Sequence, residues 1–371
     1  MKVALDVSAV PEHLAGAGRY IAELAKRLPQ NDVTTTLVAR TTDADRWRSL
    51  SPRAQVAPIV PAGRAQRLVY EAVRLGGSEA ARQADVWHAP HYTMPRRSST
   101  PTVVTIHDLT FFTNPEWHER SKVAFFKQAI RHSAKHADVL ISVSEFTARQ
   151  IEEFIPNHAP VVVAPHGVDL ERFTVESSAD RELFQSHGLA VDTPYLFFLG
   201  TFEPRKGIDV LLKAFEALSR EHPTLELWLA GQAGWGVRDV EETLRTHSAA
   251  PRIKRLGFVD EAVLPALLRG AQCVVYPSRG EGFGLPVLEA LACGAPVVTS
   301  ADTVMAEVAG STALLAPVGD AAGIAEAINE VLHQSSEERQ VGARVSRQRA
   351  ELFTWDFSLT RHLDAYQLAK G

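Results

Sequence analysis

Cysteine is scarce in this 371-residue chain, which contains only Cys273 and Cys293. Both lie in apolar runs, as buried free thiols do, and the sequence has no CxxC motif. These absences exclude a disulfide framework, and they predict a protein of the reducing cytoplasm.

Long apolar runs are also missing. No stretch approaches the roughly 18 apolar residues that a membrane-spanning helix needs. The first ten residues, MKVALDVSAV, are interrupted by Asp6, so they favour a buried strand over the apolar core of a secretory signal. We therefore expect a soluble protein with neither a membrane-spanning helix nor a secretory leader.

Metal ligands in a recognisable pattern are absent as well. The sequence has no convincing Asp-x-Asp element, and the pairs His88/His91 and His132/His136 have no nearby third ligand of the usual pattern. We therefore expect no metal and no other cofactor. A serine hydrolase is not expected either, because it would need a GxSxG elbow, which does not occur.

Charge is unevenly distributed along the chain. Residues 1–170 contain 20 Lys and Arg against 17 Asp and Glu, whereas residues 171–371 contain 19 against 27. Residues 40–97 alone hold ten arginines and five acidic residues. Such a basic face can attract the anionic surface of a membrane or an anionic acceptor, and a plain solvated surface is the alternative. Nucleic acid is not an expected partner, because the whole chain is acidic and no recognition motif occurs.

Short apolar runs alternate with amphipathic segments along the whole sequence. In the first half, the predicted strands are Lys2–Val7, Thr34–Val38, Val86–His88, Thr102–Ile106, Val139–Val143 and Val161–Ala164, and the predicted helices are Arg19–Leu28, Gln66–Gly76, Val123–Lys135 and Ser144–Phe154. In the second half, the strands are Tyr195–Leu199, Glu226–Leu229, Ile253–Arg255, Cys273–Tyr276, Val297–Thr299 and Ala313–Leu315, and the helices are Ile208–Leu218, Val237–His247, Glu261–Arg269, Leu285–Cys293 and Ala321–Leu332. Continuous apolar strands alternating with helices are typical of parallel sheets covered on both faces.

A polar, less periodic stretch from about Asp169 to Thr193 separates the two series and predicts a linker with a short helix. The chain length also suits two domains of similar size. We therefore predict an α/β protein with two Rossmann-like, doubly wound domains that face each other across a cleft. Because ligands bind at the carboxyl ends of parallel strands, we expect a site shared by the two domains.

The segment from Pro277 to Ala290, PSRGEGFGLPVLEA, is the most informative. It follows a predicted strand and runs through three glycines into a helix, where Pro286 suits the first turn. Free amides at such a helix start form an anion site for a diphosphate. Glu281 before the helix and Glu289 inside it can meet a sugar and a ribose diol. A plain strand–turn–helix with two surface glutamates is the alternative.

A pair of cations follows the first strand of the second half. Arg205 and Lys206 lie in FLGTFEPRKG, residues 198–207, directly before a predicted helix. Adjacent cations at the carboxyl end of a parallel strand suit the charge of a phosphate, whereas a surface basic pair is the other interpretation. Their position at the ligand-binding edge of the sheet favours a function.

Two further motifs lie in the first half. His107 and Asp108 follow the strand Thr102–Ile106, where they can donate a hydrogen bond to a sugar hydroxyl or orient an acceptor, and a purely structural pair is the alternative. Gly16 and Gly18 lie in GAGRY, before the first helix, and we expect this loop to bring backbone close to the ligand. It lacks the third glycine of a dinucleotide fingerprint.

Eight short motifs follow one another along nearly the whole chain: AGAGRY, VVTIHDL, SVSEFT, PHGVD, GTFEPRKG, LAGQ, LGFVDEAVLPALL and YPSRGEGFGLPVLEALACGAPVV. Together they resemble the retaining glycosyltransferases of family 4, which have the GT-B fold, and the pattern is closest to that of its mannosyltransferases. The pair Glu281 and Glu289 matches the E-x7-E feature of that family. The resemblance implies transfer of a hexose, with GDP-mannose as the favoured donor, to a glycan or lipid-linked acceptor in cell-envelope polysaccharide synthesis.

The resemblance also implies roles for individual residues of the second half. Arg205 and Lys206 would neutralise the donor diphosphate, while Glu289 would hold the ribose and Glu281 the donor sugar. The loop and helix start around them would complete the donor site through Gly282, Phe283, Gly284 and Leu285.

Other residues of the implied site come from elsewhere in the chain. His107 would lie against the sugar with Asp108 beside it, and Gly16 or Gly18 would lie near the diphosphate. The nucleotide base would lie against the backbone near Phe258 and Val259. Thr201, at a position where some relatives carry an arginine, would also belong to the donor site.

In the GT-B fold, residues 1–170 would form the acceptor-binding domain and residues 171–351 the nucleotide-sugar-binding domain. A C-terminal helix, about residues 352–371, would pack back onto the first. The implied mechanism retains the anomeric configuration of the sugar. The acceptor hydroxyl attacks the sugar from the face that the diphosphate leaves, and the leaving diphosphate oxygen takes the proton of this hydroxyl. Such a reaction requires no side-chain nucleophile.

Other functions stay open from the sequence. A nucleotide-sugar epimerase or hydrolase on the same scaffold would convert the donor without an acceptor, and a transferase could use a UDP-, dTDP- or ADP-sugar. A protein that merely binds sugar nucleotides would usually have lost Glu281, Lys206 or His107, and all three are present.

Overall fold

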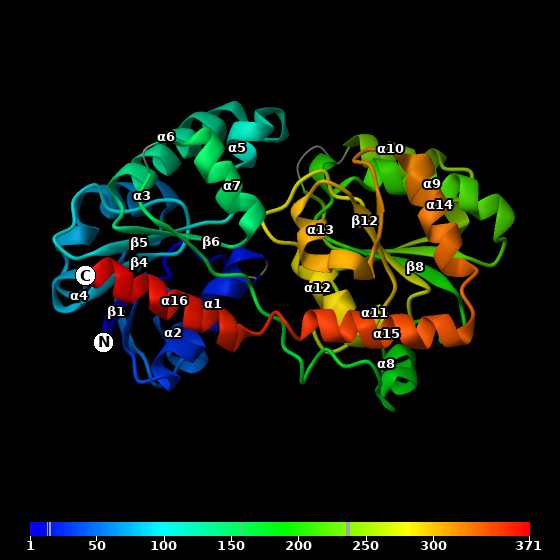
Figure 1. The fold of residues 1–371 in the computed structure, drawn as a ribbon, viewed down its shortest axis with the longest axis horizontal. Coiled ribbons are helices and arrows are strands. Elements are labelled where there is room, and N and C mark those ends of the chain that lie inside the picture. The colour runs from blue at the N-terminus through cyan, green and yellow to red at the C-terminus, as the bar shows by residue number, and fades with distance from the viewer. Residues whose placement is uncertain (13, 15, 157, 235–237) are drawn as a thin grey trace. The chain divides into compact units, whose positions relative to one another are not determined.

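The computed structural model describes residues 1–12, 14, 16–156, 158–234 and 238–371, and these form two compact units. One unit, the N-terminal domain, contains Met1–Gly167 together with Trp355–Gly371, and the other, the C-terminal domain, contains Val168–Thr354. Each is an α/β unit built on a parallel sheet (Figure 1). This confirms the fold class that the alternation of apolar runs and amphipathic segments predicts.

The N-terminal domain is built on seven parallel strands in the order β3-β2-β1-β4-β5-β6-β7. They are β1 (Lys2–Asp6), β2 (Thr34–Arg40), β3 (Gln55–Val60), β4 (Val86–Ala89), β5 (Thr102–Ile106), β6 (Val139–Ser142) and β7 (Val161–Val163). The strand order reverses between β1 and β4, because the chain first builds outward from one side of β1 and then returns to its other side. The loops after β1 and β4 therefore part at the carboxyl edge, where such sheets bind ligands.

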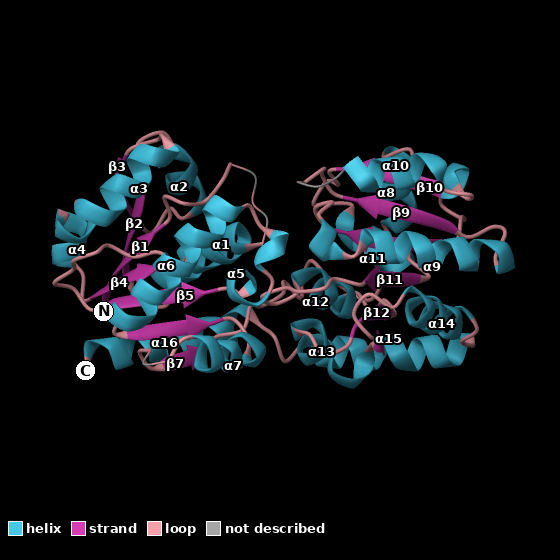
Figure 2. Ribbon diagram, turned by 90° about the horizontal axis from the view of Figure 1, so that it is seen from above, coloured by secondary structure: helices cyan, strands magenta, loops and turns pink. Residues whose placement is uncertain are grey.

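Helices cover both faces of this sheet, as Figure 2 shows. They are α1 (Ala17–Arg27), α2 (Ala44–Leu50), α3 (Arg64–Val73), α4 (Glu79–Gln83), α5 (Thr110–Thr113), α6 (Arg120–His136), α7 (Glu145–Phe154) and α16 (Trp355–Lys370). Side chains alternate along β1, so Val3 and Leu5 pack with residues of α1 and α16, whereas Ala4 packs in a second cluster with residues of α4, α6 and α7. The last helix of the chain is thus part of the N-terminal core.

A buried series of hydrogen bonds holds α16 on this sheet. Tyr366 Oη lies 2.8 Å from His88 Nδ1, and His88 Nε2 lies 2.8 Å from Thr105 Oγ1. Tyr20 Oη lies 2.9 Å from Thr105 Oγ1 and 2.8 Å from His362 Nε2. His362 Nδ1 lies 2.6 Å from a carbonyl oxygen one turn earlier in α16 and must donate to it, because a carbonyl only accepts. Donation then runs in one consistent order from Tyr366 to His362, and both imidazoles are neutral.

Burial supports the neutral state of these imidazoles. It lowers the pKa of His362 to about 4, and it lowers the pKa of His88 well below its ordinary value. Water cannot replace a missing charge partner in the interior, so the charged form of a buried imidazole is disfavoured. The order of donors and the lowered pKa values therefore agree.

The C-terminal domain is built on six parallel strands in the order β10-β9-β8-β11-β12-β13. They are β8 (Tyr195–Leu199), β9 (Glu226–Ala230), β10 (Ile253–Gly257), β11 (Cys273–Tyr276), β12 (Val297–Ser300) and β13 (Leu314–Ala316). Its helices are α8 (Asp180–Ser186), α9 (Ile208–Glu221), α10 (Arg238–Thr246), α11 (Leu264–Gly270), α12 (Leu285–Ala292), α13 (Val304–Ala309), α14 (Ala321–Leu332) and α15 (Ser336–Ala350). The order reverses between β8 and β11, so the loops after these two paired strands are neighbours.

The predicted strands agree with the structure except for β3, which the sequence does not reveal. Its run QVAPIV contains Pro58 and is only partly buried, because β3 is an edge strand, where proline is tolerated. The short helix expected between the two halves is α8, and Cys273 and Cys293 are buried free thiols as predicted. Across the described residues, no helix is long and apolar enough to cross a membrane.

Candidate functional site

Two loops meet at the carboxyl edge of the C-terminal sheet. One follows β8 and contains Arg205 and Lys206, and the other follows β11 and leads through residues 277–284 into α12. They approach each other at Gly207, where a Cβ atom would lie 2.0 Å from the carbonyl oxygen of Pro277. Gly207 also has φ +70°, so only glycine suits this position. The close approach brings the cations of one loop to the carboxylate of the other.

Arg205, Lys206 and Glu281 form one cluster. Arg205 Nη1 donates to Glu281 Oε2 at 2.8 Å, and Lys206 Nζ donates to Glu281 Oε1 at 2.5 Å. Lys206 is 8% exposed, so its ammonium is almost wholly removed from water. The structure thus brings together three predicted residues from two motifs that lie about 75 positions apart in the sequence.

The Glu281 carboxylate has further donors within the C-terminal domain. Tyr276 Oη donates to Oε1 at 3.1 Å and Ser278 Oγ donates to the same atom at 2.9 Å. Lys206 Nζ in turn lies 2.8 Å from Tyr276 Oη. Sequence reasoning did not assign Tyr276 or Ser278 to the site, although both lie in the YPSRGEG motif. Their hydroxyls fix the orientation of the carboxylate.

The charges in this cluster stabilise one another. Burial alone would raise the pKa of Glu281, but Arg205 and Lys206 outweigh it and lower the pKa to about 2. Burial would likewise lower the pKa of Arg205, but Glu281 and Glu203 raise it above its ordinary value. For Lys206 burial prevails over Glu281 and the pKa is lowered. Arg205 and Glu281 are therefore fixed in their charged forms.

A bidentate ion pair locks the two loops together. Arg279 Nη1 and Nη2 donate to Asp209 Oδ1 and Oδ2 at 2.9 and 2.7 Å, and the Arg279 amide donates to the Arg205 carbonyl oxygen at 2.7 Å. Arg279 and Asp209 are 70 positions apart, so no local pattern could have revealed this pair. It positions the backbone that carries Arg205 and Lys206.

Helix α12 begins as the glycine pattern predicts. Gly284 is its N-cap with φ 94°, a conformation that favours glycine, and Pro286 lies in the first turn. Phe283 and Leu285 are buried, and Gly282 lies one residue further toward Glu281. Pro286 has no N–H, and the Val287 and Leu288 amides donate to the Gly284 carbonyl oxygen, so this helix start offers the Leu285 amide and the positive end of its dipole.

The other predicted donor-site residues of the C-terminal domain lie in α12 or after the strands β8 and β10. Glu289 lies in α12 and is 3% exposed, and its charge helps to raise the pKa of the Cys293 thiol, which burial raises most. Thr201 is exposed after β8, whereas Phe258 and Val259 follow β10, with the Phe258 side chain 63% exposed. Their contacts with a donor stay predictions.

His107 and Asp108 lie at the end of β5 in the N-terminal domain. Asp108 accepts hydrogen bonds from Tyr92 Oη at 2.8 Å and from Thr110 Oγ1 at 2.6 Å. His107 Nε2 donates to the Pro90 carbonyl oxygen at 2.8 Å, and burial lowers the pKa of this imidazole. His107 is therefore neutral and carries its proton on Nε2, which leaves Nδ1 as a hydrogen-bond acceptor. Asp108 shapes the loop after β5.

The glycine loop after β1 leads into α1 in the same domain. Gly16 is the N-cap of α1, with φ 47° and ψ −117°, and its carbonyl oxygen accepts from the amides of Arg19 and Tyr20. Gly18 is buried in the first turn of the helix. The positive φ of Gly16 explains one of the two glycines; the role of both toward a ligand stays a prediction.

Among the residues that the structure describes, no group of three or more His, Cys, Asp or Glu side chains is arranged to hold a metal ion. The rings of His132 and His136 lie 4.6 Å apart on α6, as their spacing predicts for a helix. His88 belongs to the hydrogen-bond series that holds α16.

Two family models match the chain, and together they cover most of it. The model described as Glycosyltransferase Family 4 matches residues 14–172, and the model described as Glycosyl transferases group 1 matches residues 179–348. The O-antigen chain mannosyltransferase B of Escherichia coli is 30% identical over 385 residues, which covers 99% of this chain and 100% of that protein.

Solved structures of similar shape were also found. The sucrose-phosphate synthase of Thermosynechococcus elongatus has a TM-score of 0.78 at 22% identity, covering 99% of both chains. Anabaena HepE in complex with UDP-glucose has a TM-score of 0.76 at 19% identity, covering 98% of this chain and 99% of that one. With the two parallel sheets, these matches confirm the GT-B fold that the eight motifs imply.

Proposed function

The chain belongs to glycosyltransferase family 4 and is a glycosyltransferase, and from this premise we propose that it transfers mannose from GDP-mannose to a hydroxyl group of a glycan or lipid-linked acceptor, with retention of configuration. The observation that carries this proposal is the convergence of Arg205 and Lys206 on Glu281 beside the start of α12. A buried lysine, a partly buried arginine and the N-terminal end of a helix are groups that suit a diphosphate.

The proposed chemistry depends on the charge of the leaving diphosphate. Arg205 and Lys206 bind its oxygens as the bond to the sugar breaks, and Glu281 accepts hydrogen bonds from hydroxyls of the donor sugar. A buried cation is worth more against developing charge than an exposed one, because little water screens it. The leaving oxygen takes the proton of the acceptor hydroxyl, so the reaction needs no side-chain nucleophile and no metal. His107 accepts a hydrogen bond from a sugar hydroxyl through Nδ1.

Mannose is the favoured sugar because a relative aligned over the full length of both chains is named a mannosyltransferase. The structurally similar HepE was solved with UDP-glucose, so a uridine donor is the first alternative to test, followed by dTDP- and ADP-sugars. An epimerase or hydrolase would consume the donor alone.

Sugar nucleotides incubated with and without acceptor test the proposal. GDP-mannose, UDP-glucose, dTDP-glucose and ADP-glucose would each be mixed with the protein, and released nucleoside diphosphate would be measured by chromatography. We expect release of GDP from GDP-mannose that depends on acceptor, and an α-linked product by NMR. Release without acceptor would identify a hydrolase, and an inverted product would refute retention.

We also propose that the N-terminal domain contacts an anionic membrane surface through α3. Val69 and Val73, four residues apart on this helix, are 65% and 71% exposed, and Arg64 and Arg74 lie at its two ends. Exposed apolar side chains between cations suit the interface of an acidic bilayer, where each cation near the surface contributes about 1 kcal/mol.

Replacing both valines with serine should weaken binding to vesicles of phosphatidylglycerol and phosphatidylcholine at least tenfold, because full burial of one valine side chain contributes about 1.5 kcal/mol and a factor of ten corresponds to about 1.4 kcal/mol. Co-sedimentation measures this. Val341 and Val345 on α15 are a matched pair, also four residues apart and 45% and 43% exposed, and their replacement should leave binding unchanged. Equal binding by all three proteins would refute the contact through α3.

A further inference from the structure

The N-terminal domain contains a pocket of about 330 Å³. Its wall comes from α3 and α6, which lie over the same face of the sheet in Figure 1, and from the loops after β1 and β4. The strand order reverses between β1 and β4, so the pocket lies at the edge where sheets of this kind bind ligands. None of the residues placed in the donor site above lines it.

The wall of the pocket is basic. Arg64 and Arg67 of α3 and Lys122 of α6 line it, and none of the lining residues that the structure describes is acidic. Lys122 pairs with Glu119 at 2.9 Å, but both side chains are substantially exposed, so this pair neutralises little. Three cations on two helices therefore face one small volume.

The ion pair of Arg67 is incomplete. Arg67 Nη1 lies 3.0 Å from Glu71 Oε2, and both side chains are largely buried. Burial, helped by the neighbouring Asp6, raises the pKa of Glu71 to about 7. The charged form of Glu71 is thus disfavoured, so the charge of Arg67 is only partly compensated and can attract another anion.

His91 adds an unsatisfied polar atom to the same wall. It lines the pocket, and within the described residues its Nδ1 atom is buried without a hydrogen-bond partner. Such an atom costs free energy, and it has almost no accessible surface through which a ligand in the pocket could reach it. The His91 ring is stacked near the Phe126 ring, with centroids 6.3 Å apart and an angle of 15° between planes. His91 therefore contributes to the aromatic side of the pocket.

Phe125 and Phe126 supply the apolar part of the wall. Both line the pocket, and Phe125 is 41% exposed although it is a large aromatic residue. Flat aromatic side chains beside a few polar groups are typical of pockets for small organic ligands. The ligand must therefore combine an anionic group with a less polar body such as a sugar ring.

We propose that this pocket binds the phosphate group and first sugar of a phosphorylated acceptor, with Arg64, Arg67 and Lys122 on the phosphate and Phe125 and Phe126 beside the sugar ring. This inference rests on the proposed glycosyl transfer and names the class of its acceptor. Near pH 7 a phosphate monoester carries between one and two negative charges and a phosphodiester carries one, and either charge suits three partly compensated cations. The volume is at the lower end for ligand pockets and holds one sugar phosphate rather than a long oligosaccharide.

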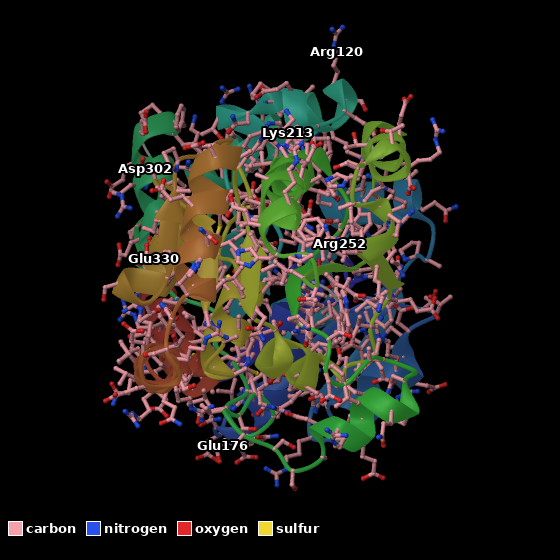
Figure 3. All side chains as sticks on the ribbon, turned by 90° about the vertical axis from the view of Figure 1, so that its right-hand side faces the viewer. Arg120, Glu176, Lys213, Arg252, Asp302 and Glu330 are labelled. Carbon is pink, nitrogen blue, oxygen red and sulfur yellow. The ribbon has the colours of Figure 1, made fainter. Side chains whose placement is uncertain are left out.

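Titration calorimetry on the full chain tests this assignment. The ligands are mannose 1-phosphate, the neutral methyl mannoside, and farnesyl phosphomannose in detergent. Arg64→Ala combined with Lys122→Ala should weaken binding of both phosphates at least tenfold. Arg120→Ala is the matched control, because Arg120 starts the same helix as Lys122 but points away from the domain in Figure 3, and it should leave binding unchanged.

The outcomes separate the sources of the phosphate and the two proposals. Tighter binding of the farnesyl compound than of mannose 1-phosphate would identify a lipid-linked acceptor, and equal binding a soluble sugar phosphate; both support the assignment. Equal binding of methyl mannoside, or an unchanged double variant, would overturn it even if transfer is measured. Failure of transfer from every sugar nucleotide would overturn the proposed function, while the titrations would still report on phosphate binding.

Discussion

Replacing Lys206 with alanine is expected to lower kcat/KM for sugar transfer about 30- to 1000-fold while the protein stays folded. That range corresponds to ~2–4 kcal/mol of transition-state stabilisation, the usual cost of losing one preorganised group that meets developing charge. The effect is large because Lys206 is buried, where its charge is little screened.

The fold should tolerate this substitution because Glu281 keeps other partners. Arg205, Tyr276 and Ser278 all still donate to its carboxylate. Lys213→Ala is a suitable control, since Lys213 is exposed on α9, a few residues further along the chain, and is labelled in Figure 3. Steady-state kinetics with a thermal-unfolding check on each variant measures the outcome. A Lys206→Ala enzyme as active as the wild type would remove this residue from the diphosphate site.

The N-terminal domain is expected to lose stability steeply as the pH falls below about 6.5. Burial lowers the pKa of five of its histidines, which are His88, His91, His107, His166 and His362. Each has a pKa near 6.5 in the unfolded chain. Between that value and the lower folded value, the unfolded state binds the extra proton, so falling pH favours unfolding. Each such group contributes ~1.4 kcal/mol per pH unit.

Two carboxyl groups act in the opposite direction. Burial raises the pKa of Asp6 and Glu71, so the folded state binds their protons more tightly and gains stability as the pH falls toward their unfolded values. The histidines outnumber the two carboxyl groups, so the free energy of unfolding of the domain should fall as the pH falls below about 6.5.

Urea unfolding followed at pH 7.5, 6.5 and 5.5 tests this expectation. The free energy of unfolding should fall with pH, and His362→Gln should reduce the slope by about one proton. A flat profile from pH 7.5 to 5.5 would show that these imidazoles are not held neutral in the folded domain.

The sequence was sufficient for most of the fold because hydrophobic pattern and strand burial coincide here. β5, β8 and β11 have the predicted bounds, since each is a short apolar run between turn residues. The sequence did not reveal β3, because an edge strand does not need a continuous run of apolar residues. The short helices α2 and α5 were not predicted either, and α5 has only four residues, too few for a periodic pattern.

The site was only partly predictable, and the reason lies in sequence distance. Arg205, Lys206 and Glu281 could be proposed because each lies at the end of a predicted strand. Their mutual contacts could not be foreseen, because they depend on Gly207 approaching Pro277 and on the remote pairing of Arg279 with Asp209. The basic pocket in the N-terminal domain could not be predicted either. The sequence shows the excess of arginine in residues 40–97, but it does not show that two of these arginines line one pocket with Lys122 of α6.

The most direct test is to compare the binding of GDP and GMP by the wild type and by the double variant Arg205→Ala, Lys206→Ala. We predict that the wild type binds GDP at least tenfold more tightly than GMP, because the second phosphate meets both cations, and that the double variant loses this preference. A wild type that binds GDP and GMP equally, or a double variant that keeps the preference, would show that the donor diphosphate binds elsewhere.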